Sequence, residues 1–385
     1  MERIQSVNIE RIQWACHQFG ITPYELATKA GIPESAIERL LNGDGTTFNY
    51  LQKIAEFLGH GVLFFVEQGP VDEATAYTPQ FRTILNRKPN LSAKLRKFVR
   101  RVEKQREVYI ALQEAISEPA INFTPPVLTG NGHNSEIVRE WLGLRTNNPL
   151  FSHRFDFDIY REMVEDKGVL VILSNGYNGK WQMPKNDPIL GFSIYHEFYP
   201  VIVVKKQSDQ RQVFTLMHEL AHLLIHKTSW VDDEHDLDSY VAQERDASAL
   251  AGRVLVPDVV LARLRDQDKP SNPADFDIWL DRERRALGVS GEVILRRLLD
   301  SGRLYQEEYT AYREWKDSGD WDQQEGGFRL YRHREPVHIF GDKFVRTVFE
   351  ALQAKEITLV KASTYLDNLK IHDVHALEQY CYANV

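Results

Sequence analysis

Apolar residues in the first part of the chain recur every three to four positions, in short runs that each end at a glycine. This period is typical of amphipathic helices, and a glycine after the last apolar residue indicates the C-terminal end of a helix. The spacing predicts helices over 9–19, 22–30, 33–42 and 48–58. Residues 1–68 are therefore expected to fold as an all-helical domain.

The second and third of these helices are separated by a tight turn at Gly31. Thr22 and Glu25 have the spacing of a capping box at the start of the second helix. Two short helices joined in this way are typical of a helix-turn-helix, whose second helix enters the DNA major groove. The recognition helix would be 33–42. Its candidate base-contacting residues are Ser35, Arg39 and Asn42.

The charge of this recognition helix does not favour DNA. Glu34 and Glu38 lie in the same helix as Arg39, and carboxylates that face phosphates weaken binding. The whole chain has a formal net charge of −8, which argues against a general nucleic-acid binder. DNA, a protein partner and a second copy of the chain, as a homodimer, all remain candidate ligands of this domain.

The pattern changes after residue 147. A helical run over 155–166 is followed by short apolar runs, which are typical of buried strands. Strands are expected at 169–173, 190–195 and 200–204. The last two strands can pair as a hairpin around 196–199. Residues 147–260 are therefore expected to form a small sheet with helices.

The two remaining regions are expected to be helical. The linker region, 69–146, contains a basic helix over 92–116, preceded by Arg82, Arg87 and Lys88. This segment could contact nucleic acid or an acidic partner, or form a solvated bridging helix. The C-terminal region is 261–385, with helices expected over 291–299, up to 315, over 344–352 and over 359–366, and a loop over 318–327. The fold class that follows is α+β.

The segment 214–226 carries the clearest chemical signal. It is apolar apart from a few polar positions and contains neither glycine nor proline, so it predicts a buried helix. His218 and His222 lie one turn apart on one face of that helix and can bind the same metal ion. Glu219 is rotated off the ligand direction but remains close enough to accept the proton of a bound water. This is the His-Glu-x-x-His pattern of zinc peptidases.

A catalytic zinc ion has three protein ligands and one open position, so a third ligand is expected. The best candidate is Glu244, which begins a second helical run over 244–257. Ser248 lies one turn further on, where it can support Glu244 or reach a histidine ligand. The rival ligands are His226, which should lie beyond the ion, and the acidic residues and His235 of the segment 232–238, which is expected to be a loop between the two helices.

The segments 211–222 and 244–257 resemble the ImmA/IrrE-type zinc metallopeptidases, in the subset with an N-terminal XRE-type helix-turn-helix domain. The resemblance implies that His218, His222 and Glu244 bind Zn²⁺ and that Glu219 is the general base. The chain departs from the family at two positions. Met217 replaces a smaller residue, and Ser248 stands where the family usually has Asn.

The resemblance implies a zinc-dependent regulatory endopeptidase, with a gluzincin-like set of ligands. Its substrate would be a protein, such as a helix-turn-helix repressor or a partner from a toxin–antitoxin system. One of the two strands expected at 190–195 and 200–204 would bind that substrate in extended form. The alternative is a non-catalytic DNA-binding regulator or antitoxin with a structural or sensory metal domain. Hydrolysis also needs a group that stabilises the oxyanion. The candidates are Tyr195, His196, His226 and Tyr240.

Two further observations limit the cellular setting. Cys16 and Cys381 lie at opposite ends of the chain, which excludes a disulfide framework. No apolar stretch reaches transmembrane length, and the N-terminus lacks the pattern of a signal peptide. A cytoplasmic protein without a membrane partner is expected.

Overall fold

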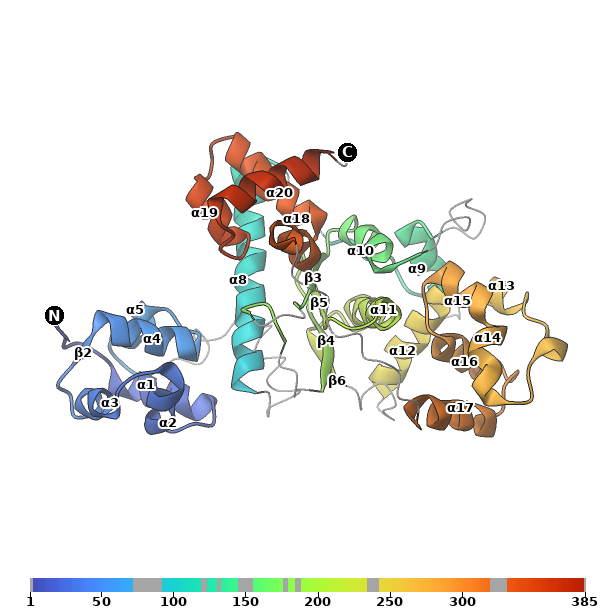
Figure 1. Ribbon diagram of the computed structural model, residues 1–385, viewed down its shortest axis with the longest axis horizontal. Helices are drawn as coiled ribbons and strands as arrows, with labels where there is room; N and C mark the ends of the chain where they lie inside the picture. The colour runs from blue at the N-terminus through green and yellow to red at the C-terminus, as the bar shows by residue number, and fades with distance from the viewer. Residues whose placement is uncertain are drawn as a thin grey trace. The chain divides into compact units, whose positions relative to one another are not determined.

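A computed structural model describes the chain over residues 3–71, 92–118, 123–129, 133–144, 155–175, 179–183, 188–233, 242–318 and 331–383. The chain divides into two compact units, Met1–Glu103 and Lys104–Val385. Helices dominate both units, and the second also contains a small mixed sheet, so the fold class is α+β as the sequence predicts (Figure 1). None of the described helices combines the length and the apolar character needed to cross a bilayer.

The first unit contains the four predicted helices of the N-terminal region and a fifth, α5, that the sequence pattern missed. They are α1 (Ile9–Gln18), α2 (Pro23–Ala30), α3 (Glu34–Leu41), α4 (Phe48–Leu58) and α5 (Val62–Val66), with a short antiparallel pair β1 (Arg3–Ile4) and β2 (Thr46–Thr47). The Thr22–Glu25 capping box is present, and Gly31 ends α2 in the left-handed conformation that glycine adopts without strain. The local signals therefore act as the sequence predicts, and a core of fully buried residues such as Ile12 and Ile54 packs the helices together.

The basic helix is α8 (Ala93–Ala115), which begins in the first unit and ends in the second. Several of its arginines donate hydrogen bonds to carbonyl groups of their own unit. Arg100 binds the carbonyl of Gly59 in the first unit, and Arg106 binds those of Phe198 and Tyr199 in the second. These arginines stabilise loops of the protein itself. The upstream basic residues Arg82, Arg87 and Lys88 lie outside the described residues.

The sheet of the second unit has the strand order β3-β5-β4-β6. Its strands are β3 (Leu170–Leu173), β4 (Ile189–Ile194), β5 (Val201–Val204) and β6 (Trp230–Asp233). The predicted hairpin is confirmed because β4 and β5 pair in antiparallel register, while β3 and β5 are parallel. The expectation of a loop at 232–233 was wrong, since these residues continue β6. Pairing with β4, at the edge of the described sheet, outweighs the low strand propensity of two aspartates.

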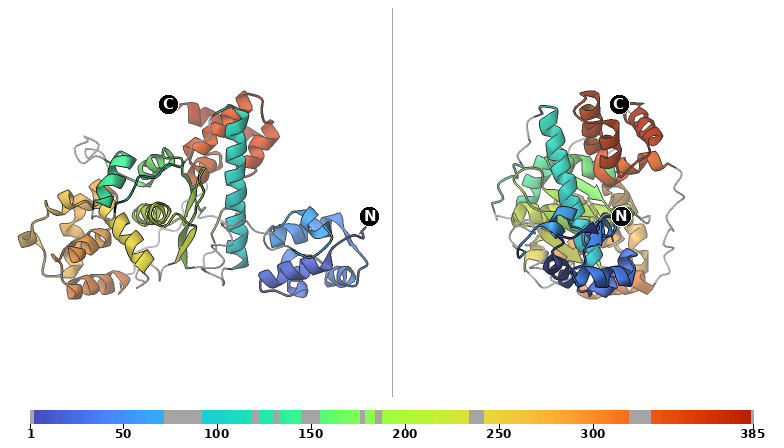
Figure 2. Two further views of the ribbon diagram at one scale, coloured as in Figure 1. Left: turned by 180° about the vertical axis from the view of Figure 1, so that it is seen from behind. Right: turned by 90° about the vertical axis from the view of Figure 1, so that its left-hand side faces the viewer.

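Helices cover both faces of this sheet. On one side lie α9 (Asn134–Leu142), α10 (Phe157–Glu165), α11 (Asp209–Ile225) and α12 (Ala242–Leu255), and α11 packs directly on β4 and β5. On the other side lies α18 (Glu335–Gln353), which contacts β3. Figures 1 and 2 show the sheet between α11 and α18. Every residue of β3, β4 and β5 is buried, as expected of strands that are covered on both faces.

Arg161 of α10 joins three elements at this sheet. Its side chain is 4 % exposed and forms an ion pair of 2.8 Å with Glu165. It also donates hydrogen bonds to the carbonyls of Val171 in β3 and of His338 and Ile339 in α18. The guanidinium has enough donors to satisfy all of these acceptors in one buried place.

The C-terminal region is helical, as predicted. Its elements are α13 (Asp258–Leu261), α14 (Phe276–Trp279), α15 (Asp281–Leu287), α16 (Gly291–Asp300), α17 (Gln306–Ser318), α18, α19 (Leu359–Tyr365) and α20 (Ile371–Ala383). The helix expected over 344–352 is the second half of α18, which bends at Gly341. The sequence pattern missed α9, α15 and α20. The predicted loop lies outside the described residues from 319 onward.

Candidate functional site

The motif segment lies within α11, as predicted. The helix begins after Ser208 and continues without interruption to Ile225 because the segment contains no glycine or proline. It packs between the sheet and α12, so most of its surface is covered. His218 is 1 % exposed, and Glu219 and His222 are fully buried. Three polar side chains are thus held in the interior, where each needs a polar partner or a cation.

The structure brings His218, His222 and Glu244 together. His218 Nε2 lies 3.0 Å from His222 Nε2, and Glu244 Oε2 lies 3.3 Å and 3.5 Å from these two nitrogens. Among the described His, Cys, Asp and Glu side chains, these three form the group whose spacing could hold a metal ion. A tetrahedral zinc ion with bonds of about 2.0–2.2 Å separates its ligand atoms by about 3.3–3.5 Å. The two spacings to Glu244 lie in this range and the His218–His222 spacing is about 0.3 Å below it, so the group is close to the arrangement that one such ion needs.

The second nitrogen of each histidine has a partner that leaves Nε2 available. Ser248 Oγ lies 3.2 Å from His218 Nδ1, and His226 Nδ1 lies 2.9 Å from His222 Nδ1. A neutral imidazole that offers Nε2 to a cation carries its proton on Nδ1. Both histidines are thus placed to donate from Nδ1 and to ligate through Nε2. The donor set suits a divalent cation, so the residues present fit zinc.

The electrostatics of Glu244 agree with this geometry. In the metal-free site, burial raises the pKa of its carboxyl group, but the hydrogen bonds and positive charge of protonated His218 and His222 outweigh burial and hold that pKa well below its usual range. A cation bound at Nε2 of neutral imidazoles would supply that positive charge in their place. The carboxylate is therefore ionised at neutral pH, as a metal ligand must be.

Trp230 is a site residue that the sequence did not reveal. Its indole Nε1 donates a hydrogen bond to Glu244 Oε1, and its ring stacks on His222 with centroids 4.3 Å apart and planes 13° apart. It is the first residue of β6 and 6 % exposed. A tryptophan beside an acidic run carries no motif, and only the pairing of β6 with β4 brings it to the histidines.

Gly191 of β4 lies directly under Glu219. A Cβ atom at this position would meet Glu219 Oε1 at 2.8 Å, Thr215 Cγ2 at 2.7 Å and the carbonyl oxygen of Val203 at 2.9 Å. Only glycine leaves room for the Glu219 carboxylate against the strand. A glycine inside an apolar strand was a signal for such a close approach, although the sequence did not say what approaches.

The other residues considered from the sequence have different places. His226 ends α11 and contacts His222, so it supports a ligand and is not a member of the three-residue group. The main-chain nitrogen of Tyr195 donates to Ser229 Oγ, and His196 Nδ1 accepts a hydrogen bond from the main chain of Phe198 within the hairpin. The rest of the acidic segment, 234–238 with His235, and Tyr240 lie outside the described residues.

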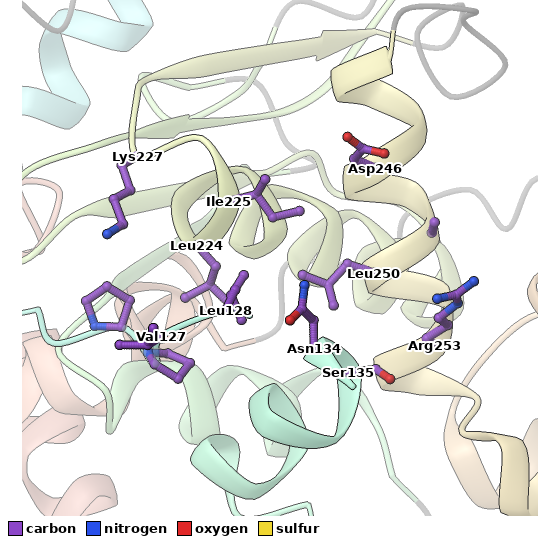
Figure 3. A pocket seen from close by; sticks show the side chains of 13 residues that line it. Val127, Leu128, Asn134, Ser135, Leu224, Ile225, Lys227, Asp246, Leu250 and Arg253 are labelled. Carbon is purple, nitrogen blue, oxygen red and sulfur yellow. The ribbon is translucent and has the colours of Figure 1, made fainter. Parts of the chain in front are cut away.

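A pocket of about 740 Å³ lies beside the C-terminal end of α11 (Figure 3). Its lining from α12 includes Asp246, Ala249 and Arg253. At 100° per residue, these positions lie on the face of α12 opposite Glu244. The pocket is therefore separate from the candidate metal group, on the far side of the helix.

The helix-turn-helix residues all lie on one exposed surface. Ser35, Arg39 and Asn42 are exposed on or beside α3, and Arg39 Nε donates to the carbonyl of Ser35. Glu34 and Glu38 are exposed on the same helix. The outer face of α3 thus presents one arginine beside two carboxylates.

Two family models match the chain. Residues 165–299 match a peptidase model described as the IrrE N-terminal-like domain, and residues 12–61 match a model described as helix-turn-helix. Neither a search of curated proteins nor a search of solved structures gives a significant match. The two segments occur in the order that the resemblance predicts. The chain therefore joins a segment similar to helix-turn-helix domains to a segment similar to the IrrE N-terminal-like domain.

Proposed function

We propose that this protein is a zinc-dependent regulatory endopeptidase that cleaves a protein partner. The observation that carries the proposal is the buried group of His218, His222 and Glu244, with Glu219 beside it in the same helix. The match of the surrounding segment to a peptidase family model supports the same conclusion. Among the described residues the group has three members, which is the number that leaves one position for a reactant.

Each residue then has a defined task. When bound, a zinc ion would supply the Lewis acidity that lowers the pKa of a water molecule and polarises a peptide carbonyl. His218, His222 and Glu244 would hold it through Nε2, Nε2 and Oε2. Glu219 takes the proton of the water onto a carboxylate oxygen and later passes it to the leaving amine. The buried surroundings strengthen these electrostatic interactions because they exclude bulk water.

The sequence suggested that the strand at 190–195 or 200–204 binds the substrate in extended form. The structure contradicts this, because β4 pairs on one side with β5 and on the other with β6, and β5 lies between β3 and β4. Within the described sheet, β6 has the edge that starts at the metal group. We therefore place the substrate backbone along β6, where main-chain pairing would give affinity.

The helix-turn-helix domain would bring the enzyme to its substrate. The match over 12–61 supports DNA as one ligand of the domain, whereas the carboxylates on the outer face of α3 favour a basic protein surface. The resemblance points to a helix-turn-helix repressor or a partner from a toxin–antitoxin system as the protein that is cut.

The test combines metal analysis with one substitution. Purified wild-type protein should contain about one zinc per chain, and chelation should stop cleavage of a partner protein chosen among the products of neighbouring genes. Glu219→Gln should keep the zinc and abolish cleavage, whereas Glu197→Gln, at an exposed position of the hairpin, should change neither. If Glu219→Gln binds zinc and retains full biological activity, the peptidase proposal is wrong. A non-catalytic metal domain would then explain the zinc.

A further inference from the structure

We infer that Trp230 is a positioning residue that holds two metal ligands from different helices, Glu244 of α12 and His222 of α11, in the geometry the cation needs. The inference rests on the proposed zinc centre. It adds to that proposal a third element, the edge strand β6, as part of the construction of the site.

The strand pairing explains how Trp230 reaches the ligands. Trp230 lies opposite Ser193 of β4 in the antiparallel register, and paired residues of neighbouring strands extend from the same face of a sheet. Gly191, two positions before Ser193, lies against Thr215 and Glu219 of α11, so this face is the one that α11 covers. The small, fully buried side chain of Ser193 leaves room for the indole beside it.

The hydrogen bond from Trp230 divides the two oxygens of Glu244 between two partners. Oε1 accepts from the indole Nε1, whereas Oε2 faces the two imidazoles. A hydrogen bond to an ionised carboxylate is stronger than one between neutral groups, and the buried surroundings strengthen it further. Rotation of the carboxylate would leave a buried N–H without its acceptor, which is costly. Trp230 thereby holds the Glu244 carboxylate in the orientation in which one oxygen meets the indole and the other faces the cation position.

The stacking contact fixes the plane of the second ligand. The ring of His222 lies almost parallel to the indole, and the ring of His226 lies 5.2 Å from the indole at 25°. His222 therefore cannot tilt toward the indole, and its Nδ1 remains at His226. The indole of Trp230 thus holds two orientations at once: that of the Glu244 carboxylate and that of the His222 ring whose Nε2 faces the cation position.

The substitution Trp230→Phe separates these roles from general packing. Phenylalanine keeps an aromatic ring beside His222 but removes the indole N–H. Loss of such an outer partner weakens metal binding by about 10- to 100-fold in metalloproteins. We expect a loss in that range for zinc alone, measured without substrate by competition with a chromophoric chelator.

A matched control is Trp181→Phe. Trp181 is also buried, at 4 % exposure, and packs on Phe340 with ring centroids 4.8 Å apart. The Trp181→Phe protein should lose about as many packing contacts as Trp230→Phe does, and its zinc affinity should equal that of the wild type. Thermal unfolding of the three metal-free proteins shows whether the two substitutions perturb the fold equally.

Cobalt provides a second measurement, whose first part uses the wild-type protein and so does not depend on how well Trp230→Phe folds. Paramagnetic Co²⁺ in the wild-type protein should strongly shift one exchangeable indole resonance among its seven tryptophans, because that indole donates to a cobalt ligand. The shifted resonance should persist in Trp181→Phe and be absent from Trp230→Phe.

The outcomes are distinct. If the wild type binds zinc and Trp230→Phe binds it equally well, or if no indole resonance shifts with cobalt, Trp230 is not a positioning residue and the peptidase proposal stands. A wild type that binds neither metal refutes both. A weakened zinc affinity in a protein that cleaves nothing supports the role of Trp230 and removes only the proposed activity.

Discussion

The close approach of β4 to Glu219 makes Gly191→Ala the most informative substitution in the protein. The added methyl carbon would lie 2.7–2.9 Å from Thr215 Cγ2, Glu219 Oε1 and the carbonyl oxygen of Val203. Atoms in ordinary van der Waals contact are about 3.5–4.0 Å apart, so each of these distances is too short by about 1 Å. The Val203 carbonyl belongs to the paired strand β5 and cannot yield, so the two side chains must move.

The expected effects follow from these overlaps. Insertion of one methyl group into a well-packed interior costs about 1–3 kcal/mol of unfolding free energy. A displacement of Glu219 by ~1 Å would lower kcat by about 100-fold, because proton transfer depends on the placement of the carboxylate. The zinc content should stay at the wild-type level, since the three atoms nearest to the methyl carbon belong to Thr215, Glu219 and Val203 and not to the candidate metal ligands.

The assay compares three proteins: wild type, Gly191→Ala and Gly179→Ala. A Cβ atom at Gly179 would meet no other atom within 4 Å, so this control adds the same methyl group in open space. Unfolding in urea, zinc content and the rate of substrate cleavage are measured for each. If Gly191→Ala cleaves at the wild-type rate with unchanged stability, Glu219 is not confined by β4 and the reasoning fails.

Two other substitutions test the rest of the molecule. Arg161→Met should lower the unfolding free energy by about 3–5 kcal/mol, because it removes the buried partner of Glu165 and the donor to the carbonyl groups of Val171, His338 and Ile339. In contrast, Arg285→Met breaks a solvent-exposed ion pair and should change that free energy by less than about 1 kcal/mol; equal effects in urea unfolding would refute the buried-pair argument. Arg39→Ala should reduce the slope of log binding constant against log salt concentration by about 1, the value of one lost charge contact with DNA, as measured by mobility shifts at several salt concentrations. A wild type without any salt dependence would mean that α3 does not bind phosphates.

The sequence alone was sufficient to predict those features that depend on interactions between residues close together in the chain. The helices of the first unit end at glycines such as Gly31 and Gly59, whose left-handed conformations depend only on the residue itself. His218 and His222 share a face because they are four residues apart in one helix, whatever surrounds that helix. Glu244 was preferred as the third member of the group because it begins a second helical run, and the resemblance to a family supported that choice. Its distance along the chain carries no geometric information, so rival ligands remained.

The tertiary structure alone decided the contacts between elements distant in the sequence. Two aspartates predicted a loop, but the register of β6 against β4 made them part of a strand and brought Trp230 to Glu244 and His222. The same sheet placed Gly191 under Glu219. Such contacts depend on which strands pair and in which register. The pairing and register are set by which faces of the sheet become buried against helices, and a local stretch of sequence does not contain that information.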